Sequence, residues 1–187
     1  MLQRLQLLVL LGLIPLMLSA CIGSMISKQT QPEIKEQLYV DARLNFAIKH
    51  PLSWKLQELP VSSPQYRSDT VRWKIEDPTM QHREAGEMLI RSTPAAAKTT
   101  LAELLESYLR EFPAPTMGKE KSFIHRVGNA LKSLGQDKNR GRLTIAIKGQ
   151  EQNFIISLET PASRFDELLP VFKDIVDNFV EIVPPKT

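Results

Sequence analysis

Histidine and cysteine are the side chains whose spacing most often reveals metal binding or catalysis. The three histidines are His50, His82 and His125, and none is paired with another ligand type in a recognisable metal pattern. We expect His50 to end a strand and His82 to lie in a solvated loop, while the neighbouring Arg126 disfavours His125 as a cation ligand. The sequence therefore predicts no metal site.

Motifs of known catalytic chemistry are also missing from the sequence. The chain has no nucleophile elbow, phosphate-binding glycine loop, metalloprotease helix or dinucleotide fingerprint. Carboxylates are abundant, but the sequence alone places no pair of them across a cleft. We therefore name no catalytic residue, expect no cofactor, and rank an enzyme behind a binding protein.

The single cysteine, Cys21, ends an N-terminal leader. Arg4 supplies a positive start, residues 5–18 form an uncharged leucine-rich run, and small residues precede the cysteine. This is the layout of a secretory signal peptide. Residues 18–21, which read LSAC, are similar to the lipobox of bacterial lipoproteins. The resemblance implies that residues 1–21 are signal peptide and lipobox, and that Cys21 carries a diacylglyceryl group, usually with a third acyl chain on its amine.

The alternative is an uncleaved transmembrane anchor, because residues 5–27 carry no charge and are long enough to span a bilayer. Gly12 and Pro15 interrupt this run and its strongly apolar part ends at Leu18, which favours the lipoprotein. Two or more acyl chains hold a protein stably at a membrane. Ile22 replaces the aspartate that retains enteric lipoproteins at the inner membrane. In a host with two membranes, the resemblance therefore favours the periplasmic face of the outer one.

Composition and charge limit the remaining chain to one ordinary domain. The 187 residues less the 20 before Cys21 leave 167, a usual size for a single domain. Without Arg4 there are 23 basic and 21 acidic residues, a net charge of about +2 that is too mild to imply nucleic acid. Once Cys21 is lipidated no thiol remains, which excludes disulfides and thiolate metal sites.

Charge is unevenly distributed along the C-terminal third of the chain. Between residues 119 and 148 there are eight basic residues and two acids, whereas residues 159–187 hold six acids and three bases. One interpretation is a basic patch that meets an anionic lipid headgroup, a glycan or an acidic protein. The alternative is an ordinary solvated strand face. The basic residues are Lys119, Lys121, Arg126, Lys132, Lys138, Arg140, Arg142 and Lys148.

Hydrophobic periodicity predicts the elements that would position these residues. Residues 22–37 are rich in polar side chains and are expected to be a spacer, or else an ordered arm, before a domain spanning 38–183. Two-residue alternation of apolar and polar side chains predicts strands. The expected strands cover 38–40, 44–49, 54–59, 71–75, 87–93, 143–147 and 154–158, with further extended pieces at 122–126 and 130–134.

Two stretches have the spacing of amphipathic helices. The first runs from Leu101 to Phe112, with Thr100 and Glu103 as a capping box. The second covers residues 165–179, where Pro170 predicts a kink or a start near Leu169. Strands followed by a helix, more strands and a helix predict an α+β domain, with an antiparallel sheet flanked by the two amphipathic helices.

The order of these elements resembles that of PsbP-like proteins. Residues 46–54 carry the early motif, with Phe46, Ile48, His50-Pro51 and Trp54 in place. The helix after Thr100, the meander over 130–158 and the terminal helix follow in the family's order, so the resemblance covers about 38–181. It implies an α/β/α sandwich. The family includes an extrinsic photosystem protein, a partner of a nuclear-transport GTPase, and bacterial lipoproteins of unassigned role. No functional residue of the first two is matched here.

The sequence therefore predicts a lipid-anchored envelope protein that acts as a non-catalytic binding or scaffold module. Its expected partners are the membrane, through Cys21, and a protein or anionic envelope component. The alternative is a lipoprotein that binds a small molecule or metal in a pocket between sheet and helix. A deep pocket lined by His50, Trp54 or Trp73 would favour this alternative.

Overall fold

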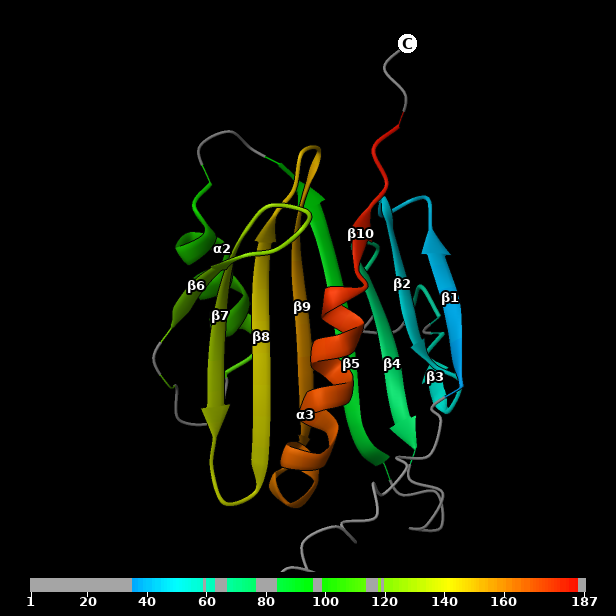
Figure 1. Ribbon diagram of the computed structural model, residues 1–187, viewed down its shortest axis with the longest axis vertical. Coiled ribbons are helices and arrows are strands. Elements are labelled where there is room, and N and C mark those ends of the chain that lie inside the picture. The colour runs from blue at the N-terminus through cyan, green and yellow to red at the C-terminus, as the bar shows by residue number, and fades with distance from the viewer. Residues whose placement is uncertain are drawn as a thin grey trace, which may run out of the picture. The chain divides into compact units, whose positions relative to one another are not determined.

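The computed structural model describes residues 35–58, 60–62, 67–76, 84–95, 99–113, 118 and 120–184. Within these ranges the chain forms two antiparallel sheets and two helices, which confirms the α+β class predicted from the sequence (Figure 1). The predicted leader and most of the predicted spacer lie outside the described residues. No helix in the described ranges is long and apolar enough to cross a membrane.

The larger sheet has seven strands in the order β3-β4-β5-β9-β8-β7-β6. Every neighbouring pair is antiparallel, so the meander expected over 130–158 is confirmed. The strands are β3 (Trp54–Leu56), β4 (Thr70–Glu76), β5 (Glu84–Pro94), β6 (Lys121–Ile124), β7 (Asn129–Gln136), β8 (Arg140–Lys148) and β9 (Gln152–Pro161).

A smaller sheet was not expected from the sequence. It has the order β1-β2-β10 and consists of β1 (Glu36–Asp41), β2 (Phe46–Pro51) and β10 (Val180–Glu181). Strand β1 begins at Glu36 rather than at the predicted Leu38, because Glu36 already pairs with Pro51, the last residue of β2. Strand β10 was missed because it has only two residues, and its pairing with Ala47 and Phe46 depends on the tertiary fold.

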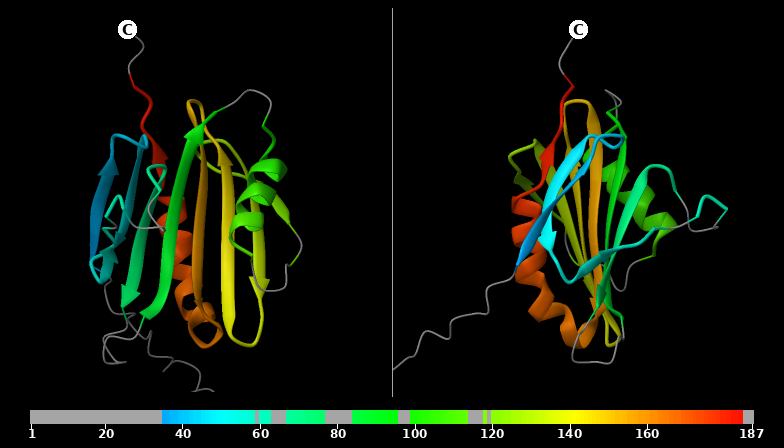
Figure 2. Two further views of the ribbon diagram at one scale, coloured as in Figure 1. Left: turned by 180° about the vertical axis from the view of Figure 1, so that it is seen from behind. Right: turned by 90° about the vertical axis from the view of Figure 1, so that its right-hand side faces the viewer.

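Alternating side chains of the seven-stranded sheet point to its two opposite faces. On one face, Met88, Ile90 and Ile156 pack under helix α3 (Ala162–Asp177). On the other face, Leu89 and Ile155 pack under helix α2 (Leu101–Glu111). Figures 1 and 2 show the two helices on opposite sides of the sheet, which gives the layers of a sandwich.

The α3 face is closed by aromatic side chains from several elements. Phe172 and Phe179 are fully buried, and the Phe179 ring lies 4.9 Å from that of Phe154 on β9. The small sheet covers the remaining part of this face, where the Phe46 ring stacks 5.7 Å from Phe179. Helix α3 runs through Pro170, so the predicted start near Leu169 is wrong. The apolar side chains of the first turns, such as Phe165, bury against the sheet and outweigh the proline's missing N–H.

The α2 face is covered over only part of its length. Helix α2 begins as predicted, since Thr100 and Glu103 form both hydrogen bonds of a capping box. Its 11 residues make a helix about 16 Å long, whereas the 11 residues of β5 extend roughly 36 Å. Leu105 and Tyr108 bury against one half of the sheet. Helix α2 does not reach the other half of this face, where only the side chains of the sheet itself lie between the strands and water.

His50 is a buried histidine on β2 that takes part in the small sheet. Its Nδ1 lies 2.9 Å from the carbonyl oxygen of Pro51, and its Nε2 lies 3.3 Å from the side-chain amide nitrogen of Gln37. These contacts fit a neutral ring whose Nδ1–H donates to the carbonyl and whose Nε2 accepts from the amide. Burial disfavours the imidazolium form and lowers the pKa of His50 below 6.5.

This lowered pKa predicts a loss of stability in mild acid. The unfolded chain takes up the proton first, so stability that is present above about pH 6.5 is lost as the pH falls toward the folded-state pKa. We expect the free energy of unfolding to fall more steeply between about pH 7.5 and 5.5 in the wild type than in His50→Gln. The difference in slope is at most about 1.4 kcal/mol per pH unit, the value for one proton. Urea denaturation at several pH values measures it, and parallel slopes would contradict the assignment.

Candidate functional site

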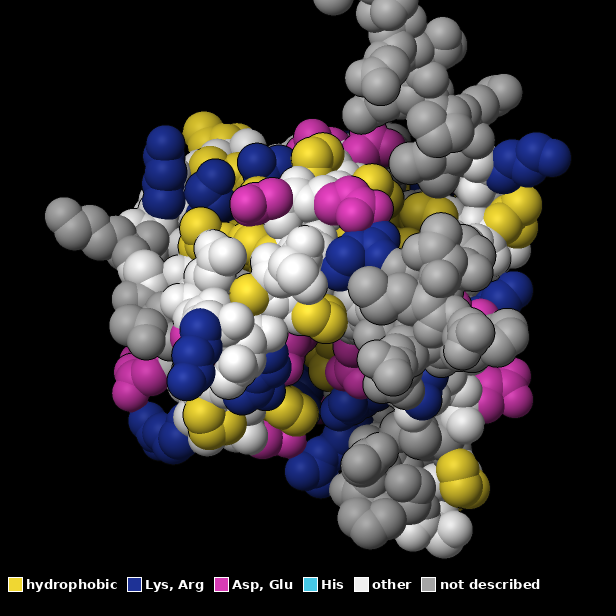
Figure 3. All heavy atoms as spheres, turned by 90° about the horizontal axis from the view of Figure 1, so that it is seen from below, with side chains coloured by type: hydrophobic (Ala, Val, Ile, Leu, Met, Phe, Trp, Pro, Cys, Tyr) yellow, Lys and Arg dark blue, Asp and Glu magenta, His cyan; other side chains and the backbone are white. Residues whose placement is uncertain are grey.

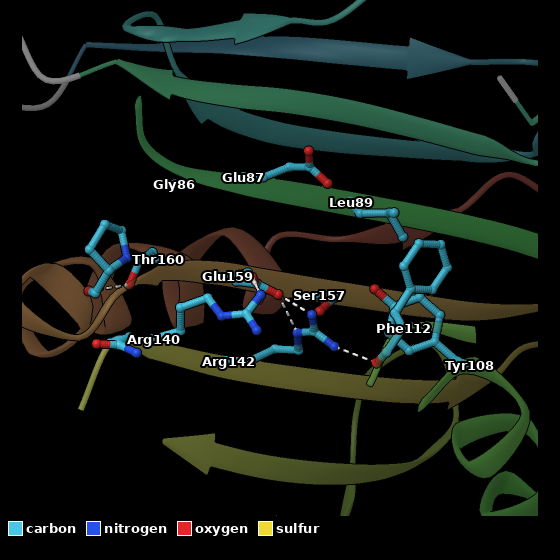
Figure 4. Close-up of a pocket in the computed structure, with 12 residues that line it drawn as sticks. Gly86, Glu87, Leu89, Tyr108, Phe112, Arg140, Arg142, Ser157, Glu159 and Thr160 are labelled. Atoms are coloured by element: carbon cyan, nitrogen blue, oxygen red, sulfur yellow. Dashed lines mark hydrogen bonds and ion pairs between the residues drawn. The ribbon is translucent and has the colours of Figure 1, made fainter. Parts of the chain in front are cut away.

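A cleft of about 460 Å³ lies where α2 ends above the seven-stranded sheet (Figure 4). Its floor comes from β5, β8 and β9, one wall from the C-terminal turn of α2, and the far end from the β7–β8 turn. The volume is within the range of small-molecule sites in proteins. The lining residues are Gly86, Glu87, Leu89, Tyr108, Phe112, Asn139, Arg140, Arg142, Ser157, Glu159, Thr160 and Pro161.

Arg142 on β8 is the central charged side chain of the cleft. Its side chain is only 8% exposed, and it forms an ion pair with Glu159 on β9, which is 26% exposed. The two residues are directly opposite in the β8–β9 register. The Nη1 of Arg142 also donates to the backbone carbonyl of Phe112. One guanidinium therefore satisfies a carboxylate of the sheet and a carbonyl at the C-terminal end of α2, where positive charge is favoured.

Arg140 brings a second guanidinium to the same carboxylate from the end of β8. Its Nη1 lies 2.8 Å from Oε1 of Glu159, and its side chain is 53% exposed. The β7–β8 turn that carries it is fixed by Asp137, whose carboxylate accepts from the backbone N–H groups of Asn139 and Arg140. These hydrogen bonds, with that from Arg140 strongest, hold the pKa of Asp137 below its usual value. The turn therefore presents Arg140 in a defined position.

The floor of the cleft is polar and lacks a side chain at one point. Thr144 and Ser157 face each other across β8 and β9 with their hydroxyl oxygens 3.1 Å apart. Burial raises the pKa of the Tyr108 phenol, against the effects of a hydrogen bond with Ser157 and of nearby arginines. Gly86 has φ of +153°, and a Cβ there would lie 2.6 Å from the Glu159 carbonyl oxygen. A side chain at position 86 would therefore collide with β9 beside the cleft.

Two more arginines contact the aromatic ring of Phe112 in the helix wall of the cleft. The guanidinium of Arg91 lies 5.4 Å from the centre of the Phe112 ring, and that of Arg72 lies 5.7 Å from it. Arg91 also holds the carboxylate of Glu111 at 2.8 Å, and this hydrogen bond lowers the pKa of Glu111. Arg72 pairs with Glu87 at 3.0 Å. The Phe112 ring is thus fixed by cation–π contacts at the end of α2.

The predicted basic patch is distributed over several parts of the fold. Arg140 and Arg142 lie in the cleft, and Lys138 lies in the turn beside it. Lys121 and Lys132 face each other across β6 and β7 at the sheet edge. Lys148 is at the opposite end of β8, and Arg126 donates to the carbonyl of Asp177, the last residue of α3. Lys119 is outside the described residues. Figure 3 shows acidic side chains interspersed among the lysines and arginines on one face of the molecule.

The residues named for a possible pocket lie elsewhere, in the core. His50, Trp54 and Trp73 are all at most 3% exposed on the α3 side of the sheet, away from the cleft. His125 is also buried, and its Nε2 lies 2.8 Å from the carbonyl oxygen of Val176. Within the described ranges, no three histidine, cysteine or acidic side chains are grouped as a metal site requires. Cys21 and His82 lie outside those ranges.

Most of the cleft residues were missed because their strands look half-exposed in the sequence. Thr144, Ser157 and Arg142 alternate with apolar residues, as on a strand face open to water, yet all three are nearly buried. A signal was present in the small side chains of that face. Thr144, Ala146 and Ser157 are too short to shield a strand face by themselves, whereas an exposed central strand usually carries long polar side chains.

Comparisons with known proteins support the fold. No protein-family model and no curated protein matches the chain. The solution structure of cyanobacterial PsbP (CyanoP) from Synechocystis sp. PCC 6803 is similar with a TM-score of 0.58 at 13% identity. The alignment covers 85% of this chain and 99% of that one. The domain therefore has a PsbP-like fold, as the order of its elements predicted.

Two further solved structures show weaker similarity. The PA94 protein of unknown function from Pseudomonas aeruginosa is 16% identical, with a TM-score of 0.46, over 81% of this chain and 99% of that one. LpqN, which is involved in cell envelope biogenesis of Mycobacterium tuberculosis, is 12% identical, with a TM-score of 0.39, over 81% and 92%. Neither similarity is strong enough to support an argument, and the likeness to CyanoP shows the fold alone.

Because Glu159 pairs with both Arg140 and Arg142, neutralising it should destabilise the protein more than neutralising an exposed carboxylate. Glu159→Gln leaves Arg142 nearly buried beside a neutral amide, and we expect a loss of about 1–3 kcal/mol of stability. Glu167→Gln is the matched control, because Glu167 pairs with Arg164 on α3 but is 65% exposed. It should change stability by no more than about 0.5 kcal/mol. Urea denaturation of both variants measures the difference, and equal effects would show that Glu159 does not compensate Arg142.

Proposed function

We propose that this chain is a lipid-anchored envelope protein whose domain is a non-catalytic binding module, with the cleft beside α2 as its binding site. The observation that carries the proposal is the cleft itself. It combines an aromatic wall at Phe112 with the convergent polar groups of Arg140, Arg142 and Glu159. Few polar groups placed in a recess that also has apolar lining are typical of small-molecule sites. The proposal thus favours the pocket between sheet and helix over a shallow scaffold surface.

The state of the cleft's titratable groups supports recognition rather than proton transfer. Glu159 accepts hydrogen bonds from two guanidiniums, so both of its carboxylate oxygens are already engaged. Tyr108 has a pKa raised above its usual value of 10.0, so its phenol is protonated at neutral pH. A general acid or base works best with a pKa near the working pH. These groups are suited to hold a ligand in place.

Anchoring through Cys21 would place this site near a membrane. The lipobox sequence supports lipidation, and acylation by two or three chains supports stable attachment. Between Cys21 and the first residue of β1, Glu36, there are 14 residues (22 to 35). Fully extended, they reach at most roughly 50 Å. The proposed site would then stay within that distance, plus the size of the domain, of the bilayer.

A protein scaffold is the second candidate function. Strand β1 is an edge strand of the small sheet, and its Leu38 and Val40 are 63% and 52% exposed. An edge strand with exposed apolar side chains can pair with a strand of another chain. This surface favours a protein partner, whereas the cleft favours a small ligand.

Lipidation gives the proposal of an envelope lipoprotein its first test. In cells fed an alkyne analogue of palmitate, we expect wild-type protein to be labelled and to sediment with membranes. Cys21→Ser removes the thioether site and should abolish both the labelling and the processing of the leader. The conservative variant Ser24→Ala, three residues beyond Cys21, is the control and should behave as wild type. Labelled Cys21→Ser protein would refute lipidation at this residue.

A further inference from the structure

We propose that the cleft beside α2 binds a small molecule that joins a compact oxyanion, either a phosphate or a carboxylate, to an apolar part. This inference rests on the proposed role of the cleft as a binding site and adds the chemical class of its ligand. It follows from the pairing of both lining carboxylates with arginines, the position of one exposed arginine and the position of one aromatic ring.

Both carboxylates in the lining of the cleft are already paired with arginines. Arg140 and Arg142 share the single carboxylate of Glu159. The other carboxylate of the lining, Glu87, is paired with Arg72 at 3.0 Å. The two arginines and two carboxylates of the lining balance in charge, and both carboxylates are engaged. An added cation would therefore have to displace an arginine, whereas an added anion can accept hydrogen bonds from N–H groups that no carboxylate uses.

Arg140 is the group that could meet such an anion. Its guanidinium is 53% exposed and gives Nη1 to Glu159. In the described part of the chain the Arg140 side chain makes this one interaction, so further N–H groups of the fork remain for a ligand. Arg142, in contrast, already uses Nε, Nη1 and Nη2 on protein atoms. Arg140 would therefore contribute binding, while Arg142 positions Glu159 and the end of α2.

The opposite end of the cleft is suited to an apolar group. Leu89 is nearly buried at the floor, and the Phe112 ring forms the wall. Arg91 and Arg72 hold this ring by cation–π contacts, so it is a fixed surface against which a ligand can pack. The view in Figure 4 shows Phe112 and Arg140 at different ends of the cleft. A ligand with both kinds of group would span the space between them.

The recessed shape favours a small molecule over a polymer or a membrane surface. A cleft of about 460 Å³ accommodates a ligand of modest size. Its oxyanion acceptors would replace water on Arg140 through charge-assisted hydrogen bonds, which are about twice as strong as neutral ones. Phosphate and carboxylate both match the planar fork of an arginine, so separate probes are needed to distinguish them.

The test uses the full, lipid-anchored protein purified in a non-ionic detergent, with titration calorimetry against detergent alone. The probes are phenyl phosphate, benzoate, inorganic phosphate and the neutral phenyl glucoside. We expect phenyl phosphate or benzoate to bind more tightly than phenyl glucoside, and less tightly when sodium chloride is raised. Arg140→Gln should weaken the anionic probe roughly tenfold. Lys121→Gln removes the same charge at the distant β6 edge and should leave the affinity within about twofold.

A second variant tests the apolar end of the cleft. Phe112→Leu keeps the site apolar but removes the flat ring, and should weaken phenyl phosphate roughly threefold. The affinity for inorganic phosphate, which has no apolar part, should not change. Loss of both affinities together would overturn the assignment of Phe112 to the apolar end.

The outcomes separate this inference from the proposed function. If phenyl glucoside binds as well as the anions and Arg140→Gln has no effect, the oxyanion class is wrong while the cleft remains a binding site. If no probe binds at concentrations up to about 10 mM, both the ligand class and the role of the cleft are overturned. If Lys121→Gln weakens binding as much as Arg140→Gln, the anion is held by general charge and not by the cleft.

Discussion

The seven-stranded sheet buries apolar side chains on both of its faces, and the two helices of this fold cover those faces to different extents. Helix α3 has 16 residues and is assisted by the small sheet, so its face closes completely around Phe154, Phe172 and Phe179. Helix α2 has 11 residues and works alone. The difference in coverage decides where the interior of the protein is dry and where it is polar.

Arg142 satisfies a backbone carbonyl at the C-terminal end of α2. The last carbonyls of a helix have no partner within the helix, and a glycine cap or water usually satisfies them. Here a side chain from the sheet reaches up to the carbonyl of Phe112, so the helix end is tied to β8. Because a guanidinium that is nearly buried needs a counter-charge, Glu159 follows on β9. The end of the helix thus determines two of the charges in the cleft.

The sequence could predict the elements but not the arrangement that forms the cleft. Alternation and helical spacing located the strands of the meander, both helices and the capping box at Thr100, because these are local patterns. The small sheet depends on β10, whose two residues carry no periodicity. The burial of Arg142 depends on how far α2 extends over the sheet, which no local pattern states. The functional hypothesis of a basic patch contained Arg140 and Arg142, yet the linear run of charges could not separate these two from Lys148 or Lys121.

The polarity of the cleft has a physical consequence beyond stability. A buried ion pair is often no more stabilising than apolar side chains of the same volume. Apolar residues at positions 142 and 159 could therefore stabilise the fold as well as the charges do. The ion pair instead places charged groups in the recess beside Phe112. The cleft exists because α2 covers the sheet incompletely. The charges of Arg140, Arg142 and Glu159 determine which chemical groups a ligand in the cleft can have.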